Sequence, residues 1–466
     1  MKYDYHIIVI GAGSAGLVVA SGASNLGAKV ALIEGNKMGG DCLNYGCIPS
    51  KTFLHTGHTL FKAQKLKTIE HLNYNVNLKS IANHVSEVIE AIAPHDSKER
   101  YESLGVDVFN DYGTMIDEHT VSVDNKLLTA KFVVIATGSS PNIPEIDGLE
   151  DCPYYTNETI FSLEEKPRHM IVLGAGPIAL ELGQAYAHIG SKVTIINRSL
   201  EIFKKDEPEV QTLMYEKLSD DGINFKMGYH IVKVEKNNTG IMVTINKNGK
   251  TEVIQGDCLL LALGREPNTS NLGLNKINIE TSKRGYIVTN NKLRTTCPSV
   301  YACGDVVGPY LFTHTASYQA SVVIQNIIFP FKRKINYRHI PWVTYTLPEV
   351  AHIGLLEKDT DGKVYLVELN KNDRAKTNDE KVGFLKLITD KKGTLVGATM
   401  VSENAGEQIA LANIAISKKM KLKSFLSMIV PYPTEIELYQ HLALTELKES
   451  FKPWQKNIVK KIFLRD

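Results

Sequence analysis

The chain has 466 residues, of which 43% are hydrophobic and 22% charged, as is usual for a soluble globular protein of two to four domains. Its formal net charge of +2 argues against the strongly basic surface of a nucleic-acid-binding protein. The sequence contains no apolar run of membrane-spanning length and no signal-peptide pattern at its start, so we expect a cytoplasmic protein.

The first residues predict a strand, a tight turn and a helix. The apolar stretch HIIVI runs directly into GAGSAG at residues 11–16. In a dinucleotide site Gly11 permits the turn, Gly13 lets the backbone approach a pyrophosphate, and Gly16 lets helix and strand pack closely. Glu34 ends the next strand, where a carboxylate accepts hydrogen bonds from a ribose. This first site is therefore expected to take the adenosine half of FAD.

Two cysteines with four residues between them follow in GGDCLNYGCIPSK, residues 39–51. Such a pair is compatible with a metal site, a structural disulfide or a redox pair. Six cysteines in so long a chain do not make a disulfide scaffold, and in a reducing cytoplasm a close pair is more often catalytic or metal-binding. The remaining four are expected to be small apolar residues in strands or turns: Cys152, Cys258, Cys297 and Cys303.

A second copy of the dinucleotide pattern lies further along the chain. Residues 174–197 align without a gap with residues 11–34, and each copy follows an apolar strand. Gly174, Gly176 and Ala179 occupy the three turn positions in this copy. Two copies in register, both flanked by the expected elements, are much stronger evidence than a single glycine motif.

The two copies differ at their last residue, which indicates different nucleotides. Asn197 takes the place of Glu34, and Arg198 and Lys204 follow it. The loss of the carboxylate with cations nearby favours a 2′-phosphate, so the second site is expected to take NADPH, with NADH as the alternative. Lys204 and its neighbour Lys205 are equally compatible with a solvated surface pair.

The tail KESFKPWQKNIVKKIFLRD, residues 448–466, predicts a basic amphipathic helix. Its apolar residues near helical spacing are Phe451, Trp454, Ile458, Ile462 and Phe463. Its basic residues are Lys452, Lys456, Lys460, Lys461 and Arg465. Such a stripe more often packs on its own protein, and peripheral contact with an anionic membrane is the alternative.

Several motifs together resemble one family. They are GAGSAG, GGDCLNYGCIPSK, ATGSSP (136–141), GAGPIALE (174–181), LALGREPN (261–268), YACGDV (301–306) and a segment beginning PWVTYTLPEVAHIG (341–354). With these, the chain resembles the class I pyridine nucleotide-disulfide oxidoreductases, which include glutathione reductase, dihydrolipoamide dehydrogenase and mercuric reductase. The resemblance extends to about residue 445.

The resemblance implies an α/β fold with two Rossmann-like domains and a C-terminal α+β dimerisation domain. The expected divisions are an FAD domain at 1–148, an NAD(P) domain at 149–267, a central segment at 268–339 that completes the FAD site, and an interface domain at 340–466. It also implies a homodimer in which both chains build each active site.

The same resemblance assigns roles to the cysteine motif. It implies that Cys47 lies next to the flavin as the charge-transfer thiolate and that Cys42 is the interchange thiol that meets substrate. Lys51 would lie near the reactive flavin nitrogen with Glu181 as its ion-pair partner. A zinc site would need two further ligands nearby, and only scattered histidines are candidates, so no resident metal site is predicted.

The resemblance further implies a set of cofactor-binding residues, with Asp305 holding the ribityl chain of the flavin. The set comprises Gly40, Asp41, Lys51, Gly113, Ala136, Thr137, Gly138, Gly264, Gly304, Asp305 and His314. Asp41 departs from the commonest family pattern, which has threonine before the first cysteine. A carboxylate near a pyrophosphate would be repelled unless it found a cation or turned away, and the sequence leaves both outcomes open.

The substrate end also departs from the disulfide-reducing members. These carry a His-Pro-Thr-x-x-Glu pattern, whereas this chain has Tyr432 at the histidine position and keeps Glu437. A phenol titrates near ~10, so tyrosine is a poor proton acceptor from a thiol at neutral pH. Mercuric reductase is similar in having tyrosine there, and reduction of Hg(II) needs thiolates but no proton transfer to a leaving thiol. Packing at a subunit interface is the alternative role for Tyr432.

Two features are unlike a full mercuric reductase. The sequence has no N-terminal metal-binding domain and no cysteine pair near its C-terminus, since Cys303 is the last cysteine. We therefore expect an NADPH-dependent flavoenzyme that reduces Hg(II) or another small-molecule or metal-ion acceptor through its cysteine pair. The alternatives are an NAD-dependent dihydrolipoamide dehydrogenase and, in a different class, a low-turnover flavin redox sensor or membrane-associated partner protein.

Overall fold

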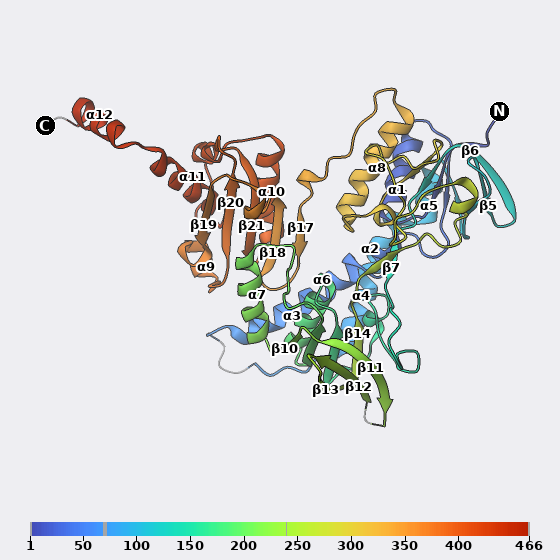
Figure 1. Ribbon diagram of the computed structural model, residues 1–466, viewed down its shortest axis with the longest axis horizontal. Coiled ribbons are helices and arrows are strands. Elements are labelled where there is room, and N and C mark those ends of the chain that lie inside the picture. The colour runs from blue at the N-terminus through green and yellow to red at the C-terminus, as the bar shows by residue number, and fades with distance from the viewer. Residues whose placement is uncertain (1, 69–71, 239, 465–466) are drawn as a thin grey trace. The chain divides into compact units, whose positions relative to one another are not determined.

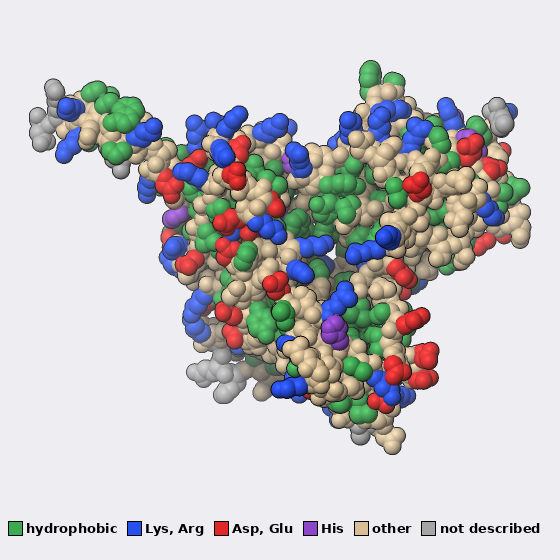
Figure 2. All heavy atoms as spheres, viewed as in Figure 1, with side chains coloured by type: hydrophobic (Ala, Val, Ile, Leu, Met, Phe, Trp, Pro, Cys, Tyr) green, Lys and Arg blue, Asp and Glu red, His purple; other side chains and the backbone are tan. Residues whose placement is uncertain are grey.

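The computed structural model describes residues 2–68, 72–238 and 240–464. They form two compact units (Figure 1). The first contains the chain up to Leu200 together with Gly222–Asn336, and the second contains Glu201–Asp221 together with the chain from Tyr337 onward. Basic and acidic side chains are interspersed on the face seen in Figure 2, in keeping with the small net charge. Arg465, which the tail prediction includes, lies outside the described residues.

The first unit begins with a sheet in the order β3-β2-β1-β6-β5-β4, with β16 also paired to β6. Its strands are β1 Tyr5–Ile10, β2 Val30–Ile33, β3 Val106–Phe109, β4 Thr114–Met115, β5 Thr120–Val123, β6 Lys126–Ile135 and β16 Val300–Ala302. The strands β3, β2, β1, β6 and β16 are parallel to one another, whereas β5 and β4 continue the sheet from β6 in antiparallel pairing. Apolar side chains of β1 and β2 are fully buried, which explains their near-continuous hydrophobic sequence.

Helices α1 Ser14–Asn25 and α8 Thr313–Ile328 pack against each other beside this sheet (Figure 1). Apolar residues from both helices and from β1 and β2 share one core. The other helices of this part are α2 Gly40–Asn44, α3 Cys47–Lys65, α4 Leu78–Ile92 and α5 Lys98–Ser103. The cysteine motif covers α2 and the start of α3, which are the next two elements after β2 in the chain.

The second dinucleotide pattern forms a four-stranded parallel sheet in the order β10-β9-β8-β14, with α6 Pro177–His188 following β8. Its strands are β8 His169–Leu173, β9 Lys192–Asn197, β10 Ile223–Met227 and β14 Cys258–Leu261. An antiparallel sheet of β11 His230–Asn237, β12 Gly240–Lys247 and β13 Lys250–Gly256 accompanies it. The short strands β7 Ser139–Pro141 and β15 Arg265–Pro267 pair with each other.

The second unit is built on an antiparallel sheet in the order β17-β18-β21-β20-β19. Its strands are β17 Trp342–Thr344, β18 Glu349–Gly354, β19 Val364–Glu368, β20 Phe384–Thr389 and β21 Leu395–Ser402. Its helices are α7 Pro208–Asp220, α9 Asp373–Thr377, α10 Ala405–Ser417, α11 Glu437–Ser450 and α12 Pro453–Phe463. The prediction of two β-α-β nucleotide-binding parts and a C-terminal α+β part is confirmed.

Short 3-10 turns complete the chain. They are η1 Ala93–Asp96, η2 Ile160–Ser162, η3 Leu274–Ile277, η4 Asp305–Val307, η5 Tyr337–His339, η6 Glu357–Asp359, η7 Leu369–Lys371 and η8 Leu422–Ser427. Among the described residues, no helix combines the length and apolar character needed to cross a bilayer.

Candidate active site

The loop between β1 and α1 depends on glycines. Gly11 has φ +104°, and a Cβ there would lie 2.4 Å from the carbonyl oxygen of Ala136. A Cβ on Gly16 would lie 1.8 Å from the carbonyl oxygen of Gly11. Gly13 differs, because a Cβ there would meet nothing nearer than the Cα of Gly40 at 3.8 Å. The fold does not need the space beside Gly13, and that space suits the close approach of a pyrophosphate.

Glu34 lies just beyond β2, and its carboxylate is hydrogen-bonded to the loop between β1 and α1. Oε2 accepts a hydrogen bond from the backbone N–H of Ala12 at 2.6 Å, and Oε1 accepts one from Asn36 at 2.8 Å. Burial raises the pKa of this carboxyl, and the two amide donors act in the opposite direction. Together with the Gly13 loop, this position fits the ribose and pyrophosphate of an FAD molecule.

Other expected flavin residues lie on loops of the same unit. Thr137 Oγ1 donates to the carbonyl oxygen of Asn268 at 2.7 Å, and Asn268 Nδ2 donates to the carbonyl oxygen of Thr137 at 2.9 Å. Gly138 has φ +71° with open space beside its Cα. Gly113 is buried, and a Cβ there would lie 3.2 Å from Cγ2 of Ile33, so its visible role is packing.

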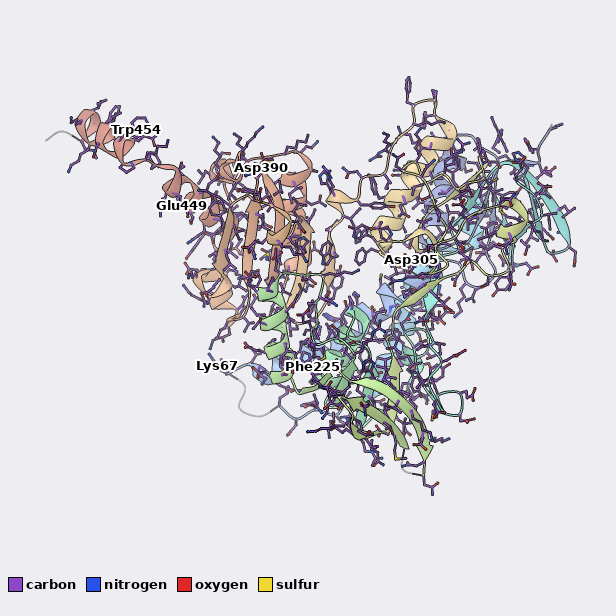
Figure 3. The ribbon with its side chains drawn as sticks, in the orientation of Figure 1. Lys67, Phe225, Asp305, Asp390, Glu449 and Trp454 are labelled. Carbon is purple, nitrogen blue, oxygen red and sulfur yellow. The ribbon has the colours of Figure 1, made fainter. Side chains whose placement is uncertain are left out.

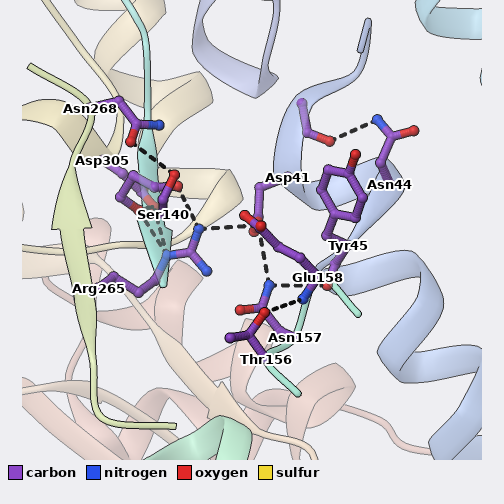
Figure 4. A network of polar contacts seen from close by, with 12 residues as sticks. Asp41, Asn44, Tyr45, Ser140, Thr156, Asn157, Glu158, Arg265, Asn268 and Asp305 are labelled. Atoms are coloured by element: carbon purple, nitrogen blue, oxygen red, sulfur yellow. Dashed lines mark hydrogen bonds and ion pairs between the residues drawn. The ribbon is translucent and has the colours of Figure 1, made fainter. Parts of the chain in front are cut away.

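Asp41 contacts a cation. Asp305, labelled in Figure 3, and Asp41 both lie beside Arg265 (Figure 4). Arg265 Nη2 is 3.1 Å from Asp41 Oδ1, while its Nε donates to Ser139 Oγ at 2.8 Å. Ser139 Oγ donates in turn to Asp305 Oδ2 at 2.8 Å, and Asn157 Nδ2 donates to Asp41 Oδ1 at 3.3 Å. Of the two outcomes that the sequence left open for Asp41, the structure shows the ion pair.

Burial and charge act on the same network. Burial raises the pKa of Asp305, whereas the Ser139 hydroxyl and the Arg265 charge lower it. Arg265 belongs to the LGREPN motif, but no local pattern pairs it with a residue more than 200 positions earlier.

The two cysteines lie on the consecutive helices α2 and α3. Cys42 is in α2 and Cys47 is the first residue of α3, and both are free thiols. The hydrogen bond from Cys42 lowers the pKa of Cys47 to about 6, against the effect of burial, with further lowering from Thr313 and the charge of Lys51. The same hydrogen bond and burial raise the pKa of Cys42. At neutral pH this arrangement favours a Cys47 thiolate beside a Cys42 thiol.

The helix start of α8 supplies a second polar neighbour to the pair. Thr313 Oγ1 lies 3.4 Å from Cys47 Sγ. The sequence drew attention to His314 instead, which is exposed and stacks on Phe312 with ring centroids 5.2 Å apart. Gly304 lies after β16, and its N–H donates to Gln319 Oε1 at 2.6 Å. The residue of this segment that contacts Cys47 is therefore Thr313, the immediate neighbour of the predicted His314.

Lys51 and Glu181 are brought together from helices α3 and α6. Lys51 Nζ lies 2.8 Å from Glu181 Oε2, and the side chain of Glu181 is only 7% exposed. The apolar sequence around Glu181 had indicated that an unpaired carboxylate there would be costly. The ion pair lies one helical turn beyond Cys47, which explains its effect on that thiol.

The second nucleotide loop repeats the geometry of the first. Gly174 has φ +103°, and a Cβ there would lie 2.3 Å from the carbonyl oxygen of Ala262. A Cβ on Gly176 would meet nothing within 4 Å, and Ala179 is fully buried in α6. Gly264 has φ +107° and open space beside its Cα. The open position again falls where a pyrophosphate is expected.

The residues expected to select the nucleotide lie at the end of β9. Asn197 Nδ2 donates to the carbonyl oxygen of Ser199 at 3.4 Å, and Arg198 is exposed. Lys204 is also exposed, but it belongs to the second unit. Asn197 and Arg198 belong to the same unit as the second nucleotide loop, and the role of all three residues in nucleotide selection stays a prediction.

Tyr432 and Glu437 lie in the second unit. Tyr432 is 72% exposed, and its hydroxyl donates to Asp373 Oδ2 at 3.2 Å. That hydrogen bond and the charge of Asp373 raise the pKa of the phenol above its ordinary value. Glu437 Oε2 accepts from the N–H of Thr434 at 3.2 Å. Asp373, Glu437 and His441 are among the residues that line a cavity of about 380 Å³.

Comparison with known proteins places this geometry in a family. Residues 5–320 match the family model described as pyridine nucleotide-disulphide oxidoreductase, and residues 340–443 match the dimerisation domain of that family. The chain is 36% identical over 460 residues to a mercuric reductase of Staphylococcus aureus, covering 96% of this chain and 84% of that protein.

Another similar protein is a dihydrolipoamide dehydrogenase of Chaetomium thermophilum, which is 32% identical over 461 residues, covering 95% of this chain and 91% of that protein. Among solved structures, the HOCl-induced flavoprotein disulfide reductase RclA from Escherichia coli has the same fold. Its TM-score is 0.86 at 24% identity, covering 94% of this chain and 99% of that one. The chain therefore belongs to the pyridine nucleotide-disulphide oxidoreductases, flavoproteins that contain FAD and depend on NAD(P)H, and it carries their dimerisation domain.

Proposed function

We propose that this protein is an NADPH-dependent flavoenzyme that reduces Hg(II), or another soft electrophile, at Cys42 and Cys47. The observation that carries the proposal is Tyr432, an exposed phenol whose hydrogen bond to Asp373 raises its pKa. A group that holds its proton so firmly is unsuited to receive one from a thiol near neutral pH. A metal substrate needs no such proton acceptor, and mercuric reductases are among the similar proteins.

The cysteine pair suits a soft metal ion. Cys47, with a pKa near 6, supplies a thiolate ligand at neutral pH, and Cys42 supplies a second one after giving up its proton. Bound FAD would supply the two-electron chemistry that connects a nicotinamide to this site. In the overall reaction one NADPH loses two electrons and releases one proton, and one Hg(II) gains the two electrons to become Hg(0).

The residues around the pair hold it in the required state. Lys51, paired with Glu181, contributes positive charge that favours the Cys47 thiolate. Thr313 donates a hydrogen bond to the same sulfur. Gly11, Gly13, Gly16 and Glu34 would hold the adenosine half of FAD, and Asp305 its ribityl chain.

We further propose NADPH as the electron donor and a homodimer as the working form. Asn197 lacks the carboxylate that would repel a 2′-phosphate, and exposed Arg198 follows it directly. In the dimer, Tyr432 and Glu437 would reach the cysteine pair of the partner subunit. The cytoplasmic location and the residue bounds of the four domains stay predictions.

The proposal is tested by anaerobic NADPH oxidation with Hg(II) buffered by excess thiol. We expect turnover that is lost in the Cys42→Ser variant and weaker with NADH. Arg198→Ala should raise the KM for NADPH while leaving the KM for NADH nearly unchanged. No turnover with Hg(II), in protein whose flavin NADPH still reduces, would contradict the proposed acceptor.

The second candidate is a dihydrolipoamide dehydrogenase, which Glu437 and the similarity to such enzymes favour. The Tyr432→His variant separates the two, because imidazole titrates near neutrality. We expect wild type to oxidise dihydrolipoamide slowly and Tyr432→His to do so faster. Fast oxidation by wild type would favour this second candidate. Slow turnover with every acceptor, in protein with a readily reduced Cys42–Cys47 disulfide, would favour a redox sensor.

A further inference from the structure

Helix α12, Pro453–Phe463, carries an apolar side that is open to solvent. Trp454, Ile462 and Phe463 are 56%, 62% and 75% exposed, and Ile458 and Val459 are exposed as well. At about 100° per residue, these five side chains occupy roughly half of the helix circumference. Trp454 is labelled in Figure 3, and Figure 2 shows apolar and basic side chains along the helix. No side chain described in α12 is buried.

Local interactions, and not packing, define this helix. Pro453 occupies its first turn, and the N–H of Lys452 donates to Gln455 Oε1 at 2.9 Å. An isolated helix of this length is only marginally stable in water, even with good capping. A surface that covers the apolar side would therefore stabilise the helix and remove these apolar side chains from water.

The charge of α12 indicates which kind of surface would accept its apolar side. Between Phe451 and Leu464 the sequence contains four lysines and no acidic residue. Lys460 and Lys461 are exposed and lie outside the apolar half of the helix. Two copies of α12 packed together would bring lysines near lysines, whereas anionic headgroups would attract them. Tryptophan, here Trp454, is also enriched at the interface between water and lipid in membrane proteins.

We propose that α12 binds flat in the interface of an anionic phospholipid bilayer and makes the enzyme a peripheral membrane protein. Its apolar half enters the boundary of headgroups and acyl chains, while Lys460 and Lys461 contact the anionic headgroups. This inference concerns a surface distinct from the redox site and does not depend on the identity of the acceptor.

The test is co-sedimentation of the flavin-loaded full chain with two kinds of vesicles. One is phosphatidylcholine with 30% phosphatidylglycerol, and the other is phosphatidylcholine alone. We expect binding to the anionic vesicles that 1 M NaCl weakens. The Lys460→Gln/Lys461→Gln double variant should lower the partition coefficient roughly 25-fold, because each lysine near an anionic surface contributes about a fivefold factor.

Matched controls separate the helix from general surface chemistry. Lys391 and Lys392 lie exposed in the turn between β20 and β21, so Lys391→Gln/Lys392→Gln removes the same charge elsewhere in the second unit. Ile462→Gln should reduce binding, whereas Ile414→Gln should not, although Ile414 on α10 is similarly exposed at 58%. Equal losses in test and control variants, or no binding by wild type, would overturn the proposal.

A measurement of oligomeric state tests the other possible partner of α12, a second subunit of the same protein. Sedimentation velocity of the Ile462→Gln variant should match wild type in the absence of lipid. A shift towards smaller species would show that α12 is a contact between subunits, and that result would also overturn the membrane assignment.

Discussion

Replacing Cys42 with alanine or with serine isolates the hydrogen bond that Cys42 gives to Cys47. This hydrogen bond is the largest cause of the lowered pKa of Cys47. A hydrogen bond from Thr313 and the positive charge of Lys51 lower it further. Alanine removes the donor, whereas serine keeps an O–H of nearly the same reach. We expect the pKa of Cys47 to rise in Cys42→Ala and to stay close to 6 in Cys42→Ser.

The size of the shift follows from the value of a charged hydrogen bond. Such a bond contributes about 1.5–3 kcal/mol, which corresponds to about 1–2 pKa units. With a pKa near 6, Cys47 is roughly 90% thiolate at pH 7; a rise of 1–2 units lowers that fraction to between roughly 50% and 10%. The alkylation rate of Cys47 at pH 7 should therefore fall roughly two- to ninefold in Cys42→Ala.

The assay is alkylation of Cys47 by iodoacetamide as a function of pH, resolved by peptide mass spectrometry on the reduced, flavin-loaded protein. Burial raises the pKa of Cys258 and of Cys303 to about 12, so neither competes in the range of interest. Equal titration midpoints for the alanine and serine variants would refute the role of the hydrogen bond and leave Thr313 and Lys51 as the causes of the lowered pKa.

Three further outcomes follow from buried charge and from loop geometry. Lys386 on β20 is 1% exposed and lies 3.2 Å from the buried carboxylate of Glu207, so Lys386→Met should cost about 3–5 kcal/mol in urea unfolding. Adding Glu207→Gln should recover part of that loss. Burial raises the pKa of Glu380 from 4.5 to about 8; the folded state then holds a proton that the unfolded state has released. Stability should thus fall as pH rises from 4.5 to 8, and thermal melts of Glu380→Gln should lack this fall. Gly13→Ala should keep the circular dichroism of wild type but lose bound flavin, whereas Gly16→Ala should disturb both.

The parts of the site that the sequence predicted are those with local signals. Gly16 is required by a contact within its own strand-loop-helix segment, because a Cβ there would clash with the carbonyl oxygen of Gly11. The pairing of Lys51 with Glu181 crosses 130 positions, yet it was predictable because the family motif and the energetic cost of a buried carboxylate pointed to the same residues.

Other features depend on tertiary contacts that leave no local signal. Lys386 stands in the strand FLKLIT, where a lysine would ordinarily face solvent, and its burial depends on glutamates from other elements. The segment Glu201–Asp221, with α7, joins the C-terminal unit through these ion pairs, although it follows the second nucleotide pattern in sequence. Neither the hydrophobic pattern nor the charge pattern specifies such a partner.

Asp41 shows how a contact far away in sequence changes the meaning of a local motif. Alone, its carboxylate would oppose a pyrophosphate, but its ion pair with Arg265 gives the two side chains no net charge. Asp41→Asn should therefore remove one negative charge from the Arg265 network, where Asp305 remains, and tighten FAD binding roughly tenfold, about 1.4 kcal/mol. Arg265→Gln should weaken it by a similar factor, and the double variant should return close to wild type. Flavin fluorescence titration of the apoprotein measures all four affinities. If the two single variants instead shift the affinity in the same direction, the pair acts by positioning the Cys42 helix and not through its charge.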